Sequence, residues 1–116
     1  MANREITFTA VGKGHTIRFT QRALEGIEKN DIRSDNFFES LQTPSKLRIV
    51  LLAGLEAWRV REKATIPPYS PDDASAIIED LGMIPVRVLV GKAFNLASGV
   101  PAEPDAPAGG PPAPNS

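Results

Sequence analysis

The chain has 116 residues, of which 41% are hydrophobic and 23% are charged, so it has the size of one domain and the composition of an ordinary globular protein. It contains no cysteine, which excludes disulfides, thiolate metal sites and a cysteine nucleophile. Two of its 14 acidic residues, Glu103 and Asp105, lie near the end, which leaves 12 against the 13 basic residues and indicates no polyanionic partner.

The first part of the chain predicts a β-hairpin. Apolar and polar side chains alternate over residues 5–9, and the alternation resumes over residues 15–19, which is the pattern of half-buried strands. We expect Gly12-Lys13-Gly14 to form the turn, with the glycines supplying its positive φ angles. Because a two-stranded hairpin is marginal alone, a helix must cover its apolar face.

The segment after the hairpin predicts a short amphipathic helix. Thr20 is a typical N-cap for a helix over residues 21–29, in which Ala23, Leu24 and Ile27 form one buried stripe.

A second short helix is expected to begin at Ser34 or Asn36 and to carry the adjacent residues Phe37 and Phe38. Two neighbouring aromatic side chains on one short helix cannot both point inward. We therefore expect one of them to be exposed, and both are candidate partner-binding residues.

A long helix should occupy the centre of the fold. Thr43-Pro44 combines a capping residue with a proline at the first helical position, and the helix should run to about Arg61. Its apolar residues surround almost the whole helix, which is typical of a central element. Gly54 costs about 1 kcal/mol of helix propensity relative to Ala, so it should mark a close crossing with a neighbouring helix. The apolar positions are Leu47, Val50, Leu51, Leu55 and Trp58 on one face, and Ile49, Leu52, Ala53, Ala57 and Val60 elsewhere.

Two further helices are predicted. Ser70-Pro71 repeats the capping signal for a helix that Gly82 ends, and Pro85 should open a last helix that closes near Gly99. We therefore expect an α+β domain over residues 1–99, with an N-terminal β-hairpin packed on a bundle of four to five helices.

Six of the last 17 residues, 100–116, are proline. Such a segment buries too little apolar surface to offset the entropy of ordering it, so we expect a disordered Pro/Ala/Gly tail.

The polar residues indicate binding and not catalysis. His15 has no acidic or cysteine partner at metal-ligand spacing and reads as an ordinary strand residue. The Asp72-Asp73 pair suits a helix N-terminus, and the Glu79-Asp80 pair suits an exposed helical face. We expect no catalytic residue, metal or cofactor.

The end of the central helix carries a basic cluster, Arg59, Arg61 and Lys63, close to Trp58. Cations there favour the helix dipole, and they also suit a partner contact with Trp58 as an aromatic anchor. Both interpretations stay open, and Trp58, Arg59 and Arg61 join the candidate partner-binding residues.

The chain also resembles the small tail assembly chaperones of long-tailed phages and gene transfer agents. The resemblance rests on the order of several short segments within residues 6 to 98. They are HTIRFTQRALEGIE over 15–28, LLAGL over 51–55, SPDDA over 70–74, Gly82, and AFNLA over 93–97.

The resemblance implies a binding function. Members of that family coat an apolar, helix-forming tape measure protein and keep it soluble until tail tube subunits polymerise around it. The implied partner is a tape measure protein, with the tail tube protein and a second copy of the chain as further candidates. The resemblance, and the absence of an apolar signal core in residues 1–5, imply a protein of the bacterial cytoplasm that is missing from the mature particle.

Two alternatives remain. One is a structural head-to-tail connector. The other is a small DNA-binding regulator, because residues 72–94 resemble a helix-turn-helix with glycine in the turn. The would-be recognition helix, however, has Arg87 among apolar residues where polar, base-contacting side chains are needed. We therefore expect no nucleic-acid partner, and no membrane partner because no apolar run reaches the ~18 residues of a span.

Overall fold

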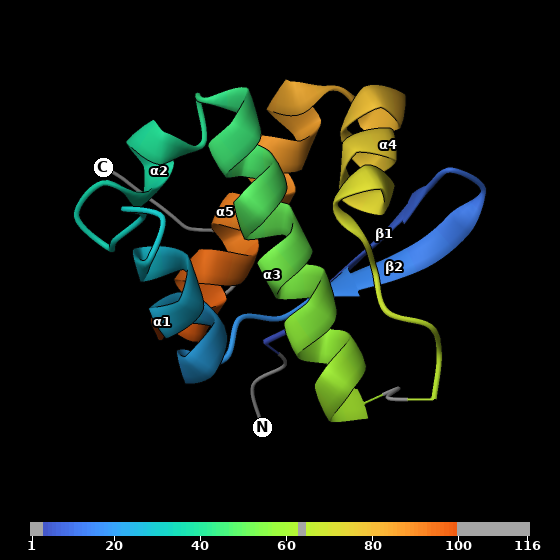
Figure 1. The fold of residues 1–116 in the computed structure, drawn as a ribbon, viewed down its shortest axis with the longest axis horizontal. Helices are drawn as coiled ribbons and strands as arrows, with labels where there is room; N and C mark the ends of the chain where they lie inside the picture. The colour runs from blue at the N-terminus through green and yellow to red at the C-terminus, as the bar shows by residue number, and fades with distance from the viewer. Residues whose placement is uncertain (1–3, 63–64, 100–116) are drawn as a thin grey trace, which may run out of the picture.

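The structure, a computed structural model, describes residues 4–62 and 65–99. Its elements are β1 (Ile6–Ala10), β2 (Lys13–Ile17), α1 (Gln21–Glu28), α2 (Phe37–Ser40), α3 (Pro44–Glu62), α4 (Pro71–Leu81) and α5 (Met83–Ala97) (Figure 1). The predicted class, a β-hairpin packed on four to five helices, is confirmed. The predicted tail over residues 100–116 and Lys63 of the basic cluster lie outside the described residues.

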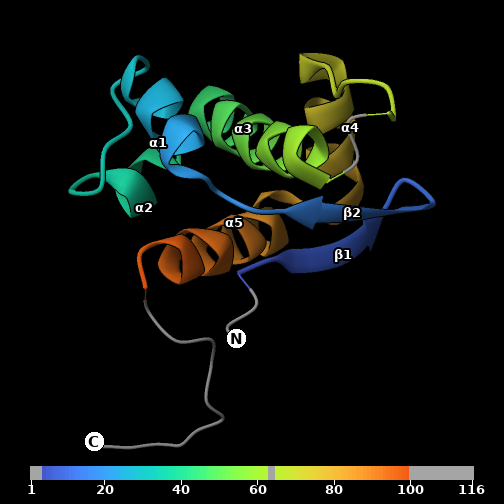
Figure 2. The ribbon, with the colours of Figure 1, turned by 90° about the horizontal axis from the view of Figure 1, so that it is seen from below.

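The elements form two layers, and α3 contacts elements of both. Figure 2 shows α1, α3 and α4 on one side, with the hairpin and α5 on the other. α3 packs against β2, α1, α4 and α5, which confirms its predicted central position. No helix among residues 4–62 and 65–99 combines the length and apolar character that a bilayer crossing requires.

The hairpin turn lies earlier in the chain than the predicted turn at Gly12-Lys13-Gly14. The strands pair antiparallel from Ile6 opposite Ile17 to Ala10 opposite Lys13, so the loop consists of Val11 and Gly12 alone. These two residues have φ angles of 53° and 74°, and positive φ at both positions is the pattern of a type I′ turn. The second strand therefore starts two residues earlier than expected, and Gly14 is a strand residue.

Gly54 marks a close approach to the hairpin and not to another helix. Its carbonyl oxygen accepts a hydrogen bond of 3.2 Å from the backbone N–H of Arg18. A Cβ atom at Gly54 would overlap Cγ2 of Ile17 and lie 3.3 Å from the ring of Phe19. The glycine therefore allows α3 to contact the end of β2 directly, which corrects the predicted helix crossing.

Two of the predicted N-caps, Thr20 and Ser70, are confirmed. The Thr20 hydroxyl accepts a hydrogen bond of 3.1 Å from the N–H of Ala23, and α1 follows. At α4, Ser70 and Asp73 form a reciprocal capping box, in which each side chain accepts from the other's backbone N–H at 3.1 and 2.8 Å. The prediction that Asp73 serves the helix N-terminus is confirmed.

α5 begins two residues before the predicted start. Gly82 alone links it to α4, and its φ of +96° reverses the chain direction within one residue. Pro85 is the third helical residue. A proline is tolerated there because N–H groups of the first turn have no partner within the helix.

Both ends of the described fold meet beside α5. The Arg4 guanidinium donates hydrogen bonds of 3.0 and 3.4 Å to the carbonyl oxygens of Leu96 and Ala97, in the last turn of α5. A cation at that end of a helix is also favoured by the helix dipole. The contact ties the N-terminal segment to the C-terminal helix.

Candidate partner-binding surface

The outer side of α3 forms an open apolar groove with α1. The inner face of α3 is fully covered, and Leu51 and Leu55 have no exposed surface. α1 is only eight residues long and covers the opposite face incompletely, so Val60 remains 61% exposed. The resulting space, here called the α1–α3 groove, has a volume of about 750 Å³. Its main lining residues are Arg22, Ala23, Gly26, Ile27, Asn30, Ile49, Leu52, Ala53, Glu56, Ala57, Val60 and Arg61.

The spacing and size of these residues suit a third helix. On α3 the lining positions Ile49, Leu52, Ala53 and Val60 follow helical periodicity, so they form one continuous stripe. Small residues on both walls allow a partner backbone to approach closely. Gly26 is the clearest case, because a Cβ atom there would meet nothing within 4 Å.

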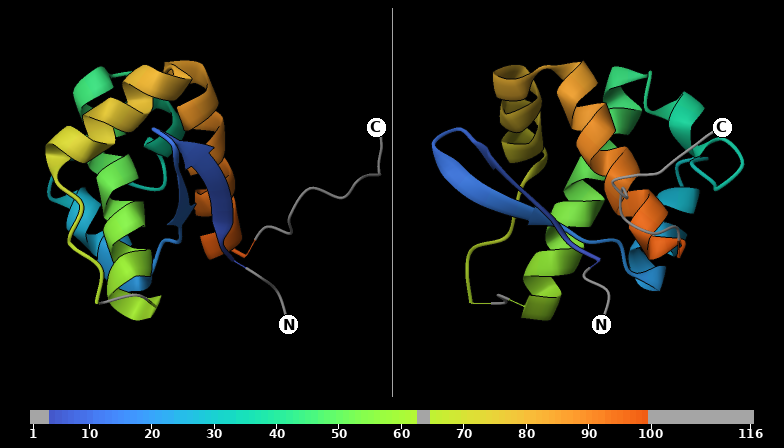
Figure 3. Two further views of the ribbon diagram at one scale, coloured as in Figure 1. Left: turned by 90° about the vertical axis from the view of Figure 1, so that its right-hand side faces the viewer. Right: turned by 180° about the vertical axis from the view of Figure 1, so that it is seen from behind.

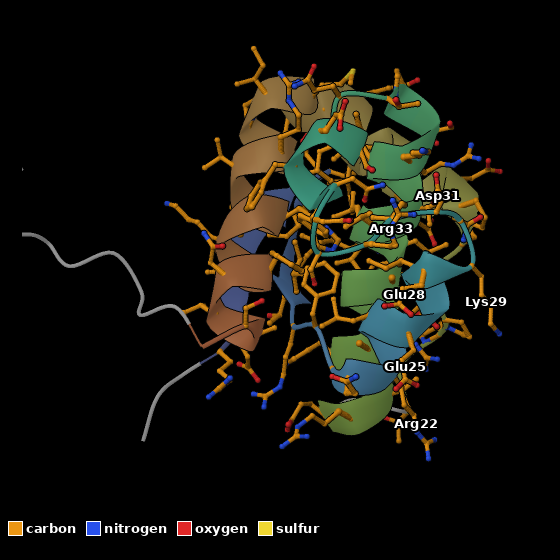
Figure 4. The ribbon with its side chains drawn as sticks, turned by 90° about the vertical axis from the view of Figure 1, so that its left-hand side faces the viewer. Arg22, Glu25, Glu28, Lys29, Asp31 and Arg33 are labelled. Carbon is orange, nitrogen blue, oxygen red and sulfur yellow. The ribbon has the colours of Figure 1, made fainter. Side chains whose placement is uncertain are left out.

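Basic side chains lie at one end of the groove. Arg22 of α1 and Arg61 of α3 both line it, and Figure 4 shows Arg22 where the start of α1 lies beside the end of α3. The Arg61 side chain is 53% exposed and forms an ion pair of 3.1 Å with neighbouring Glu62. Exposed pairs of this kind are weak, so Arg61 can reorient toward a bound anion.

Glu56 is the carboxylate that lines this groove, and its oxygens already accept hydrogen bonds from other residues of the chain. Its oxygens accept hydrogen bonds of 2.8 and 3.0 Å from the Arg59 guanidinium and one of 2.7 Å from the N–H of Tyr69. The hydrogen bond from Arg59 lowers the pKa of Glu56, and burial opposes it only in part. Arg59 also donates to the carbonyl oxygen of Ile66 at 3.1 Å. The pair therefore fastens the segment after α3 to the side of that helix.

The five predicted partner-binding residues do not come together. Arg61 lines the α1–α3 groove, whereas Arg59 is only 11% exposed and holds the chain segment just described. The indole N–H of Trp58 donates a hydrogen bond of 3.1 Å to a carboxylate oxygen of Glu5, and Trp58 does not line the groove. Phe37 and Phe38 lie on α2, beside α5.

The expected division between the two phenylalanines is confirmed. Phe38 is 52% exposed, whereas Phe37 is 1% exposed and stacks on Phe94 with ring centroids 3.9 Å apart. Phe37 is thus a core residue and offers no surface to a partner in this conformation, because α5 and Phe38 cover its ring.

The sequence interpretation missed most of the groove. The sequence pattern predicts that Ile49, Leu52 and Val60 are apolar positions of a central helix, and it does not distinguish them from the buried positions. One sequence signal could have identified them. A long helix that is apolar all round follows a short helix, residues 21–29, which cannot cover its whole length.

The second hollow of the surface contains His15. It has a volume of about 430 Å³ and lies between the hairpin, residues 66–69 and α4. His15 is 7% exposed, and its ring nitrogens lie 2.9 Å from the Tyr69 hydroxyl and 2.9 Å from the carbonyl oxygen of Ala10. Both nitrogens are therefore occupied by structural hydrogen bonds. Across the described residues, no three histidine or carboxylate side chains cluster in a way that could hold a metal ion.

Comparisons of the chain with protein-family models, with curated proteins and with solved structures find no match.

Proposed function

We propose that this protein is a phage-type tail assembly chaperone that holds apolar helical segments of a tape measure protein in the α1–α3 groove. It would keep that partner soluble until tail tube subunits polymerise around it. The observation that carries the proposal is the apolar stripe of α3 that the fold covers only in part, with Val60 61% exposed. The resemblance of the chain to tail assembly chaperones adds the identity of the partner.

The groove suits binding that must later be reversed. It is open to solvent, so a helix can enter and leave without unfolding of the chaperone. Apolar contact supplies the affinity, at about 25 cal/mol for each Å² removed from water. Arg22 and Arg61 favour a partner helix whose carboxylates, or whose negative C-terminal end, lie at their end of the groove.

The DNA-binding alternative receives no support from the surface of α5. Ile84 and Val88, near the start of this helix, are 65% and 50% exposed. A recognition helix needs polar side chains in that position to contact base edges.

Co-expression with a long, helix-rich tape measure protein tests the proposal. We expect the chain to bring the long protein into the soluble fraction and to co-purify with it. Val60→Glu should abolish this effect because it places a charge in the groove. Val11→Glu is the matched control, since it changes a valine of the hairpin loop that is 50% exposed and lies outside the groove.

Gly26→Leu provides a second test that does not weaken the fold. The new Cβ atom meets nothing within 4 Å and leucine replaces glycine in a helix, so stability should rise by about 1 kcal/mol. It should nevertheless fill the groove and prevent solubilisation of the partner. Solubilisation by both groove variants, or a fixed number of copies of the chain in mature particles, would contradict the chaperone proposal. The second result would favour the connector.

A further inference from the structure

A second apolar surface lies on α2 and α5. Figure 3 shows these two helices side by side when the molecule is seen from behind, whereas α1 and α3 face the viewer in Figure 1. Phe38, Ile84 and Val88 are its large apolar side chains, and they are 52%, 65% and 50% exposed. These residues, with the hollow between α2 and α5, are called the Phe38 face below. It is separate from the α1–α3 groove.

The exposed ring of Phe38 is held in one orientation. It makes edge-to-face contacts with Phe37 and Phe94, at centroid distances of 5.4 and 5.8 Å. Gly91 leaves room for it, because a Cβ atom there would lie only 3.0 Å from the ring. An aromatic side chain that is already fixed loses little conformational entropy when a partner covers it. Such residues are typical anchors of protein interfaces.

The charged side chains that line the hollow of the Phe38 face have one sign. This hollow has a volume of about 360 Å³ and contains Arg87 and Lys92 but no carboxylate. Neither cation forms an ion pair with any residue in 4–62 or 65–99. The residues that line the hollow are Phe38, Leu41, Gln42, Arg87, Val88, Gly91, Lys92 and Asn95.

We propose that the Phe38 face binds an amphipathic α-helix whose apolar stripe is flanked by carboxylates. On α5, Ile84, Val88, Gly91 and Asn95 follow one another at intervals of about 3.6 residues, so they form a stripe along which a second helix can lie. Phe38 would insert beside the apolar stripe of the partner. The two cations would pair with its carboxylates.

The charge also argues against a second copy of the chain as occupant. A two-fold interface brings the same patch together from both molecules, so Arg87 and Lys92 would face a patch of equal sign. The proposal does not depend on the α1–α3 groove. A chain with two faces of this kind would join two partners, one apolar and one acidic.

Binding of designed peptides to the full ¹⁵N-labelled chain tests the proposal by NMR. The probe is an amphipathic helical peptide of about 18 residues with a leucine stripe flanked by glutamates, and the control peptide has lysines in place of those glutamates. We expect the glutamate peptide to shift the amide signals of Phe38, Val88 and Lys92. It should bind at least about tenfold more tightly than the lysine peptide.

Three variants complete the experiment. Phe38→Ala and Lys92→Glu should each weaken binding of the glutamate peptide about tenfold, whereas Val60→Glu in the α1–α3 groove should leave it unchanged. Equal binding of the two peptides, shifts confined to the groove, or no shift up to about 1 mM peptide would overturn the proposal. A dimer of the free chain that Phe38→Ala dissociates would also overturn it and would assign this face to self-association.

Discussion

The hydroxyl group of Tyr69 lies 2.9 Å from Nδ1 of His15 and joins the segment before α4 to the hairpin. The other nitrogen of the ring, Nε2, faces the carbonyl oxygen of Ala10, which can only accept a hydrogen bond. Nε2 must therefore carry the proton in the uncharged ring, and Nδ1 accepts from Tyr69. Burial, with the carboxylates of Asp73 and Glu56, raises the pKa of Tyr69 and keeps its phenol protonated as this donor.

We predict that uncharged His15 is the Nε2–H tautomer, which long-range ¹H–¹⁵N NMR measures directly. Tyr69→Phe should lower the free energy of unfolding by about 1 kcal/mol, because Nδ1 loses its donor. An Nδ1–H tautomer in the wild type would contradict this arrangement, because Nε2 would then have no proton to donate to the carbonyl oxygen of Ala10.

Gly54→Ala should destabilise the protein although it replaces glycine in a helix. The new methyl group would overlap Ile17 and contact the ring of Phe19. Overpacking of a core costs about 1–3 kcal/mol, which exceeds the gain of about 1 kcal/mol in helix propensity. Chemical denaturation measures the net loss. Gly26→Ala is the control and should stabilise the chain, since its Cβ meets open space.

Ser70→Ala should lower the free energy of unfolding by about 1 kcal/mol, because it removes the hydroxyl that caps α4. Ser75→Ala in the interior of the same helix removes no capping oxygen and should not destabilise the chain. Thermal unfolding of both variants distinguishes the cap from a general effect of serine removal. Equal melting temperatures for the two would contradict the capping role.

The pair of Glu56 and Arg59 should make stability depend on pH in the acid range. Because the pKa of Glu56 is lowered in the folded state from its ordinary value of 4.5, its contribution is complete above that value and is lost as the pH falls below it. Glu56→Gln should therefore reduce the melting temperature near neutral pH. The difference between variant and wild type should shrink below pH 4.5. A difference that stays constant through this range would show that the charge does not matter.

The helix starts were predicted well, because they depend on residues that are close together in the sequence. Thr20 and Ser70 cap helices because a side-chain oxygen reaches an N–H group three residues away, and the sequence displays that spacing directly. The turn was misplaced because Val11 adopts a positive φ that its residue type disfavours. Strand pairing imposes this conformation, and a local pattern does not contain it.

The candidate surface was predicted less well because it depends on what covers each helix. Phe37 is buried and Phe38 is exposed because α5 packs on α2 and its Phe94 stacks on the ring of Phe37. The groove exists because α1 is shorter than α3. The sequence shows both lengths but not their relative placement.

The hydrogen bonds from Arg4 to Leu96 and Ala97 have a practical consequence for protein engineering. They place the two ends of the described fold next to each other, on the layer opposite α1 and α3 (Figure 2). An affinity tag or fluorophore fused at either end would leave the α1–α3 groove accessible. A short linker that joins the ends would allow circular permutation, with new termini at Val11-Gly12 in the exposed hairpin loop.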